Sequence, residues 1–194
     1  GMAHGFNNIA AVHYSSKGDL DTALDYLGRS LAIREELGDK AEIGGILNNI
    51  GVMHCDKGDL DTALDYLSRS LAIDEEFGHK RGMGLSRSNI GNAYYLKGDY
   101  EKAEEFLEKS LSIEKELGEL IELATTPLLY LIYKHLDKEY DEKEIHTLIK
   151  EAKNIEFELN LRLYELLEDK SYLETAYNQI QEKISAMDDT AKFL

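Results

Sequence analysis

The chain has 194 residues, of which 43% are hydrophobic and 31% are charged, and this balance suits one or two domains with a hydrophobic core. Its 38 acidic residues outnumber 22 lysines and arginines, and the formal net charge of -16 disfavours binding to the phosphates of a nucleic acid. The most apolar stretch, residues 123–136, is interrupted by polar residues and falls short of the roughly 20 residues that cross a membrane. Cys55 is the only cysteine, which excludes an internal disulfide and favours a reducing, cytoplasmic location.

One segment occurs twice in almost identical form. Residues 17–33 read KGDLDTALDYLGRSLAI, and residues 57–73 differ from them only in having Ser68 in place of Gly28. A third copy, KGDYEKAEEFLEKSLSI, spans residues 97–113 at the same spacing of 40 residues. A fixed period of this length predicts stacked structural repeats.

Each repeat predicts two antiparallel helices. In the second repeat, residues 41–56 carry apolar side chains at helical spacing, and a Lys-Gly-Asp turn follows. From Leu60 to Phe77 a second apolar stripe predicts the partner helix, which Gly78 ends. Because one helix pair cannot bury apolar faces on two sides, we expect the pairs to stack.

The repeat fades in the C-terminal part. Pro127 falls inside the expected first helix of a fourth repeat, where it would kink or restart the helix with Thr125 or Thr126 as the cap. Residues 145–167 and 172–187 predict long amphipathic helices without the Gly-Asp turn. We expect one continuous domain, with three regular repeats over residues 2–120 and a degenerate fourth and fifth helix pair with a polar end over residues 121–194.

These repeats resemble the tetratricopeptide repeat in its long, 40-residue form. In the second repeat the family positions are held by Leu47, Ile50, Gly51, His54, Gly58, Leu60, Ala63, Leu67 and Ser70. The third repeat matches at Ile90, Gly91, Tyr94, Gly98, Tyr100, Ala103 and Leu107. The long form is similar to arrays in G-protein-signalling modulators, kinesin light chains, and bacterial and archaeal signalling proteins. The resemblance implies an all-α, right-handed superhelical solenoid of antiparallel helix pairs.

The first repeat is offset from the others. Asn8-Ile9 lies one residue early relative to Asn49-Ile50. Either Ala10 and Ala11 take the family positions, or the first helix carries an extra residue, and the sequence leaves both alternatives open. The chain starts inside a helix whose end face bears apolar Phe6, so we expect either further repeats upstream or another molecule against that face.

The residues that usually carry chemistry are not arranged for it. The six histidines show no metal-ligand spacing, and His54 takes the tyrosine position of the family, so we interpret it as structural. Cys55 has no adjacent base or acidic pattern that marks a nucleophile, and we expect it to be structural, although it could face the groove. Acidic pairs such as Glu35-Glu36 are typical of a solvated helix face. We predict no enzyme activity, no cofactor and no metal site.

The resemblance implies that the first helix of each repeat lines a concave groove that binds a peptide segment of a partner. Asparagine side chains recur there, and their amides can pair with an extended backbone, or alternatively with neighbouring helices that they order. The predicted peptide-binding residues are Asn8, Val12, Asn48, Asn49, Val52, Ser88, Asn89, Asn92, Tyr95, Ile132 and His135.

The family's known carboxylate clamp of lysine and arginine is not matched. Its places are held by Asn48, Val52, Ser88 and Asn92, so together with the negative net charge we expect a neutral or basic protein or peptide partner. The predicted function is a protein–protein interaction scaffold. The alternatives are a regulatory or sensory arm of a larger signalling protein, and a self-associating structural module that forms a homodimer through its N-terminal face.

Overall fold

The computed structural model describes residues 2–118, 122–152 and 155–191, and over these residues the protein is all-α. The chain divides into two compact units, residues 1–117 and 118–194, which are described separately. The helices of the N-terminal unit are α1 (Met2–Val12), a π-helical turn (His13–Lys17), α2 (Leu20–Leu37), α3 (Lys40–Asp56), α4 (Leu60–Phe77), α5 (Lys80–Lys97) and α6 (Tyr100–Leu117). Those of the C-terminal unit are α7 (Glu122–His135), α8 (Glu142–Glu151), α9 (Phe157–Leu167) and α10 (Lys170–Ala191).

The division between the units falls close to the predicted end of the regular repeats. The predicted boundary itself, residues 120 and 121, lies outside the described residues, and a single continuous domain stays a prediction. None of the described helices has the length and hydropathy to cross a membrane.

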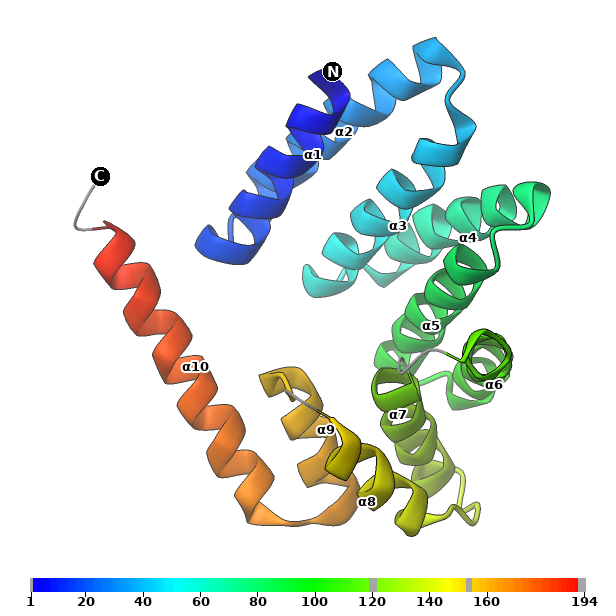
Figure 1. Ribbon diagram of the computed structural model, residues 1–194, viewed down its shortest axis with the longest axis vertical. Helices are drawn as coiled ribbons and strands as arrows, with labels where there is room; N and C mark the ends of the chain where they lie inside the picture. The colour runs from blue at the N-terminus through cyan, green and yellow to red at the C-terminus, as the bar shows by residue number, and fades with distance from the viewer. Residues whose placement is uncertain (1, 119–121, 153–154, 192–194) are drawn as a thin grey trace. The chain divides into compact units, whose positions relative to one another are not determined.

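The N-terminal unit consists of three sequential helix pairs, α1 with α2, α3 with α4 and α5 with α6 (Figure 1). Lys40 at the start of α3 forms an ion pair of 2.9 Å with Glu76 at the end of α4, and Lys80 on α5 pairs with Glu116 on α6 at 2.5 Å. Because the start of one helix meets the end of the next, the helices of each pair are antiparallel. The predicted all-α array of helix pairs is therefore confirmed.

Glycine in the left-handed conformation ends the helices of the N-terminal unit. A positive φ of 60° to 78° occurs at Gly18, Gly38, Gly58, Gly78, Gly98 and Gly118. Such a residue turns the chain out of the helix, and its N–H donates to a carbonyl of the last helical turn. Residues with a Cβ adopt this left-handed conformation only at a steric cost in free energy. Among the described residues after Gly118, positive φ occurs at Asp137 and Glu168, so the turns after α7 and α9 are made without glycine.

Glycine also allows the two helices of a pair to approach closely. A Cβ added to Gly51 on α3 would lie 2.6 Å from Cγ of Leu67 on α4, and Gly91 and Leu107 repeat this relationship in the third pair. Leu67 and Leu107 are fully buried. This close approach places the large second-helix leucine against the backbone of the first helix.

The C-terminal unit departs from two predictions. The helix α7 runs through Pro127, so of the two alternatives, a kink or a restart, the restart is wrong, and Thr125 and Thr126 are fully buried within the helix instead of acting as caps. The single helix predicted over residues 145–167 is interrupted between α8 and α9. At the break the carbonyl oxygen of Ile155 accepts from side-chain amides in place of a helical N–H, from Gln179 of α10 at 2.7 Å and from Asn160 of α9 at 3.2 Å.

Candidate peptide-binding surface

A recurrent hydrogen bond fixes the position of each first helix relative to its partner. The buried hydroxyls of Ser30, Ser70 and Ser110 on the second helices donate to backbone carbonyls of the first helices, at 3.0, 2.8 and 2.7 Å. The acceptors are Ala3, Gly44 and Gly84. A first helix held in this way presents the same face in every repeat, so equivalent residues can be compared directly.

This comparison resolves the offset in the first repeat. The serines are spaced by 40 residues, but Ala3 precedes Gly44 by 41, so α1 runs one residue ahead of the other first helices. The π-helical turn, residues 13–17, absorbs the extra residue. His13 accordingly packs against Tyr26 with ring centroids 5.8 Å apart, as His54 stacks on Tyr66 at 5.7 Å. Of the two alternatives from the sequence, the extra residue is the correct one.

The extra residue corrects the predicted groove positions of α1. With an offset of 41, the equivalents of Asn48 and Val52 are Asn7 and Ala11, whereas Asn8 and Val12 were predicted. Asn8 and Val12 are both exposed, Val12 by 55%. The sequence could not give this register, because it is set by the recurrent serine hydrogen bond. The acceptor of that bond is a backbone atom that no side-chain pattern reveals.

Asparagines of two neighbouring first helices pair with each other. Nδ2 of Asn89 on α5 donates to Oδ1 of Asn48 on α3 at 2.9 Å, and Asn48 is only 6% exposed. Asn48 therefore orders the stack, which is the structural alternative stated for these asparagines. Its neighbour Asn49 is exposed and stands beside half-buried Val52 on α3.

Between α1 and α3 lies a cavity of about 160 Å³. Its lining combines apolar side chains with two amides and consists of Asn7, Ala10, Ala11, Tyr14, Leu27, Asn49, Val52 and Met53. The hydroxyl of Tyr14, which lies in the π-helical turn, donates to Oδ2 of Asp56 at 2.8 Å. Two of the predicted site residues, Asn49 and Val52, thus meet at this cavity.

The predicted residues of α5 form a half-buried group. Ser88, Asn89, Asn92 and Tyr95 are each partly accessible, and the ring of Tyr95 lies 5.9 Å from that of Tyr100, which begins α6. These side chains present hydroxyl, amide and aromatic groups without a formal charge. They continue the polar character of Asn49 on α3.

The two predicted residues of α7 belong to the C-terminal unit. Ile132 is fully buried, so it cannot line a groove, and its assignment to the binding surface is corrected. The sequence pattern placed Ile132 at a groove position of a fourth repeat, but in this unit that side chain is part of the core. His135, near the end of the same helix, is exposed.

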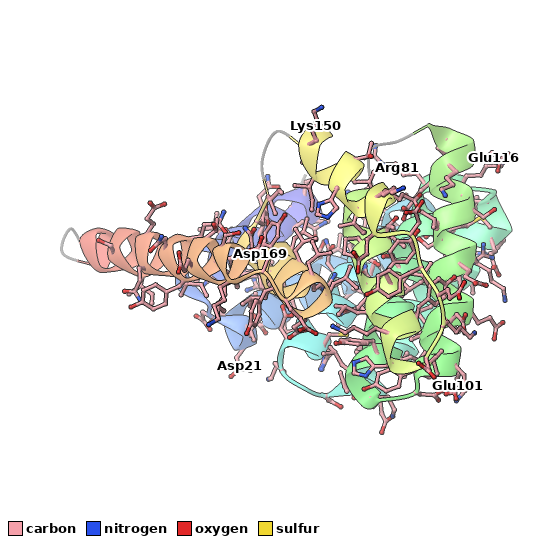
Figure 2. The ribbon with its side chains drawn as sticks, turned by 90° about the horizontal axis from the view of Figure 1, so that it is seen from below. Asp21, Arg81, Glu101, Glu116, Lys150 and Asp169 are labelled. Atoms are coloured by element: carbon pink, nitrogen blue, oxygen red, sulfur yellow. The ribbon has the colours of Figure 1, made fainter. Side chains whose placement is uncertain are left out.

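Charged residues are distributed unequally between first and second helices of the N-terminal unit. The α1 sequence contains no Asp, Glu, Lys or Arg, and α5 contains basic residues but no acidic ones. The basic residues of α5 pair with second helices: Arg87 with Glu75 at 2.9 Å, and Lys97 with Asp61. Figure 2 shows Asp21, Glu101 and Glu116 of the second helices pointing away from the ribbon. Acidic groups are therefore concentrated on the second helices.

A buried acid lies where the second and third repeats meet. Asp74 on α4 is 7% exposed and accepts a hydrogen bond of 3.3 Å from the hydroxyl of Ser86 on α5. A Cβ at Gly82 would overlap its carboxylate, so glycine leaves room for the acid. Burial raises the pKa of Asp74, because the charged form loses its hydration. The equivalent positions hold half-buried Arg34 and buried Glu114, and sequence comparison alone did not identify the burial of Asp74 or Glu114.

Neither His54 nor Cys55 is arranged for catalysis. His54 stacks on Tyr66, and its Nδ1 lies 3.4 Å from Oδ2 of Asp59, in agreement with a structural role. Cys55 is buried with Leu67 and Ile90, rather than facing the groove, and burial raises the pKa of its thiol to about 11. Within the described ranges, no three His, Cys, Asp or Glu side chains form a group that could hold a metal ion.

Solved structures with the same fold include the apo form of RapI, which superposes with a TM-score of 0.75 at 18% identity. The match covers 93% of this chain and 53% of RapI, so the chain spans about half the length of that protein. A putative kinesin light chain of Podosopora anserina with nearly identical TPR-like repeats has a TM-score of 0.64 at 16% identity, over 96% of this chain and 95% of that chain. A single-residue variant of it matches at 17% identity, over 97% and 96%. At these identities the likeness concerns the fold alone, and no curated protein matches the sequence.

Family comparison agrees with the helix pairs. Two profiles described as tetratricopeptide repeat match residues 3–37 and 42–116, which span the three pairs of the N-terminal unit. The turns at Gly18, Gly58, Gly78 and Gly98 and the close contacts at Gly51 and Gly91 lie in these ranges. The chain belongs to the tetratricopeptide repeat family.

Proposed function

We propose that this chain is a protein-interaction module that holds an extended, uncharged segment of a partner protein along α1, α3 and α5. Tetratricopeptide repeats are generally protein–protein interaction modules, and this is the first support for the proposal. The partner surface, the orientation of the segment and its charge go beyond that general role. The side chains of the N-terminal unit support each of them.

The observation that carries the proposal is that each of the three first helices contributes a side-chain amide. Asn7, Asn49 and Asn92 come from three different helices, and Asn49 and Asn92 are solvent-accessible. Each amide carries two N–H donors and one oxygen acceptor, so it can pair with either polar group of a peptide backbone. Such pairing gives affinity without requiring a particular side chain of the partner.

The distribution of charge favours a neutral segment over a basic one. The net charge of -16 by itself favours basic partners, but the acidic groups lie mainly on second helices. The first helices present amide, hydroxyl and aromatic groups, and the basic residues Arg87 and Lys97 are paired with acids of α4. An uncharged segment meets these groups without the desolvation of an unpaired charge.

Peptide selection tests this function directly. Peptides would be selected from a random phage-displayed library against the full chain, synthesised, and titrated by calorimetry. We expect uncharged peptides to bind, and Asn49→Ala and Asn92→Ala each to weaken binding roughly fivefold through the loss of one hydrogen bond. Ser68→Ala and Ser112→Ala, at exposed positions of second helices, serve as matched controls that leave affinity unchanged. Selection of acidic peptides only, or equal losses in the controls, would contradict the proposal.

A second candidate function is self-association through α1. Met2, Ile9 and Val12 are 76%, 38% and 55% exposed, which is unusual for large apolar side chains on one helix. Light scattering over a range of concentrations distinguishes the two functions. A mass that doubles with concentration in the wild type, but not in Ile9→Lys, would favour the homodimer.

A further inference from the structure

On the basis of the proposed function, we infer that the cavity between α1 and α3 is a specificity pocket for a phenylalanine of the partner segment, whose backbone N–H donates to Oδ1 of Asn7. The cavity has a volume of about 160 Å³ and lies within the N-terminal unit. Four observations support this assignment: a missing amide pair, an unsatisfied acceptor, the volume, and the chemistry of the walls.

The first observation compares two equivalent junctions between first helices. At the junction of α3 and α5, Asn89 donates to Asn48 at 2.9 Å. The equivalent residues at the junction of α1 and α3 are Asn49 and Asn7, and within the described part of the chain Oδ1 of Asn7 receives no hydrogen bond. The two equivalent amides are therefore hydrogen-bonded at the junction of α3 and α5 but not at the junction of α1 and α3. The cavity lies at the second junction.

The unpaired acceptor is the second observation. Oδ1 of Asn7 is buried from solvent although it has no donor among the described residues. A buried acceptor without a donor is unfavourable, because it has given up its bond to water without replacing it. Asn7 also lines the cavity, and a turn of its amide toward that space would bring Oδ1 within reach of a backbone N–H of a bound segment.

The volume limits what the cavity can hold. An engineered protein cavity of about 150 Å³ binds benzene, so a space of about 160 Å³ accommodates a phenyl ring. An alanine methyl would leave most of this space empty. The volume thus selects a side chain of the size of phenylalanine or leucine.

The residues that line the cavity favour phenylalanine over leucine. Ala10, Leu27 and Val52 are apolar, and none of the lining residues carries a charge. Met53 supplies a thioether, which makes favourable contacts with aromatic rings. Tyr14 contributes its ring from the π-helical turn, and its hydroxyl is already bonded to Asp56. An additional aromatic ring can pack beside it at no cost in unpaired polar groups.

A small probe tests the pocket without a known partner. N-acetyl-phenylalanine methylamide presents one phenyl group and one backbone N–H on each side of it, and the alanine and leucine analogues serve as comparison ligands. The chain has four methionines, of which Met53 lines the cavity, so NMR of methyl-labelled methionine reports directly on occupancy. We expect the phenylalanine probe to shift the Met53 methyl signal by ring current and to leave that of Met83 in place.

Two variants with matched controls identify the site. Ala11→Leu, from an exposed position on the cavity wall, should fill the space and abolish the shift, whereas Ala72→Leu on the exposed side of α4 should not. Asn7→Ala should weaken the probe roughly fivefold through the loss of one hydrogen bond, and Asn8→Ala, on the same helix but outside the lining, should not. Circular dichroism confirms that each variant keeps its helices.

Several results would overturn the pocket. These are no Met53 shift at saturating probe, an unchanged shift in Ala11→Leu, equal shifts from the alanine analogue, and tighter binding of the leucine analogue. A Met53 shift that grows with protein concentration in the absence of probe would show that a second copy fills the cavity, and would also overturn the assignment. If selected peptides still bind in a manner sensitive to Asn49→Ala and Asn92→Ala, the proposed function stands although the pocket has failed.

Discussion

Asn89 on α5 donates from Nδ2 to Oδ1 of Asn48 on α3 across 2.9 Å, and this bond joins two first helices at the surface predicted to hold a peptide. The acceptor is almost completely buried, while Asn49, the next residue on α3, is exposed. Adjacent asparagines of one helix therefore serve different purposes. One orders the stack, and the other is available to a partner.

We expect Asn89→Ala to lower the free energy of unfolding by about 1 to 3 kcal/mol, because it leaves the buried Oδ1 of Asn48 without its donor. Asn48→Ala and the double variant complete a double-mutant cycle, measured by urea unfolding. The double variant should lose less than the sum of the two single losses. Additive losses would show that the two side chains act independently.

The stability of the protein should depend on pH through Asp74. Because burial raises the pKa of this carboxyl, the folded protein binds a proton that the unfolded chain has already released. The free energy of unfolding should therefore fall as pH rises from the ordinary aspartate pKa through the raised one. At neutral pH, where Asp74 is charged and buried, Asp74→Asn should be as stable as the wild type or more stable.

Urea unfolding of the wild type and Asp74→Asn across the acidic range measures this dependence. The stability advantage of the variant should grow with pH in that window, whereas the exposed Asp65→Asn should show no such increase. If the free energy of unfolding of Asp74→Asn instead fell relative to that of the wild type as pH rises, the charged carboxylate would be stabilised by its surroundings.

Deleting Ser15 should be tolerated. The π-helical turn contains one residue more than the equivalent turns of α3 and α5, so removing an exposed residue from it allows an ordinary α-helical end without disturbing the bond from Ser30 to Ala3. Deleting Leu96, an exposed residue near the end of α5, should be far more disruptive, because no extra residue is present there. Thermal unfolding compares the two deletions, and equal losses would contradict the assignment of the extra residue.

Leu67→Ala should cost about 2 to 5 kcal/mol in urea unfolding, because the side chain is fully buried against Gly51 and its removal leaves a cavity. Leu85→Ala, at a position that is 51% exposed, should change the free energy of unfolding by about 0.5 kcal/mol or less. A small effect at Leu67 would mean that the helix pair closes around the missing side chain.

The sequence predicts the fold of the N-terminal unit well because each repeat contains its own turn residues and its own buried apolar residues. Gly38, Gly58, Gly78 and Gly98 mark helix ends at regular spacing, and Leu67 recurs as Leu107. In the C-terminal unit Asp137 and Glu168 replace the turn glycines. At the break after α8, the carbonyl of Ile155 accepts from Asn160, five residues on, and from Gln179 of α10, and only the second of these partners is distant in sequence.

The candidate site is predicted less well than the fold, because burial at a helix junction depends on which face each helix presents. Periodicity places Asn48 and Asn49 side by side but cannot assign one to the stack and the other to solvent. The shift from Asn8 to Asn7 depends on a bond to the backbone of Ala3. Ile132 follows the groove pattern of the regular repeats, yet its unit buries it.

Photo-cross-linking gives the most direct test of where a partner binds. A benzophenone amino acid would replace Asn49, exposed on α3, or Ala72, exposed on α4, and each protein would be irradiated with a peptide selected against the wild type. We expect peptide adducts from position 49 and none from position 72. Adducts from position 72 alone would show that the partner binds the second helices, and would contradict a binding surface on α1, α3 and α5.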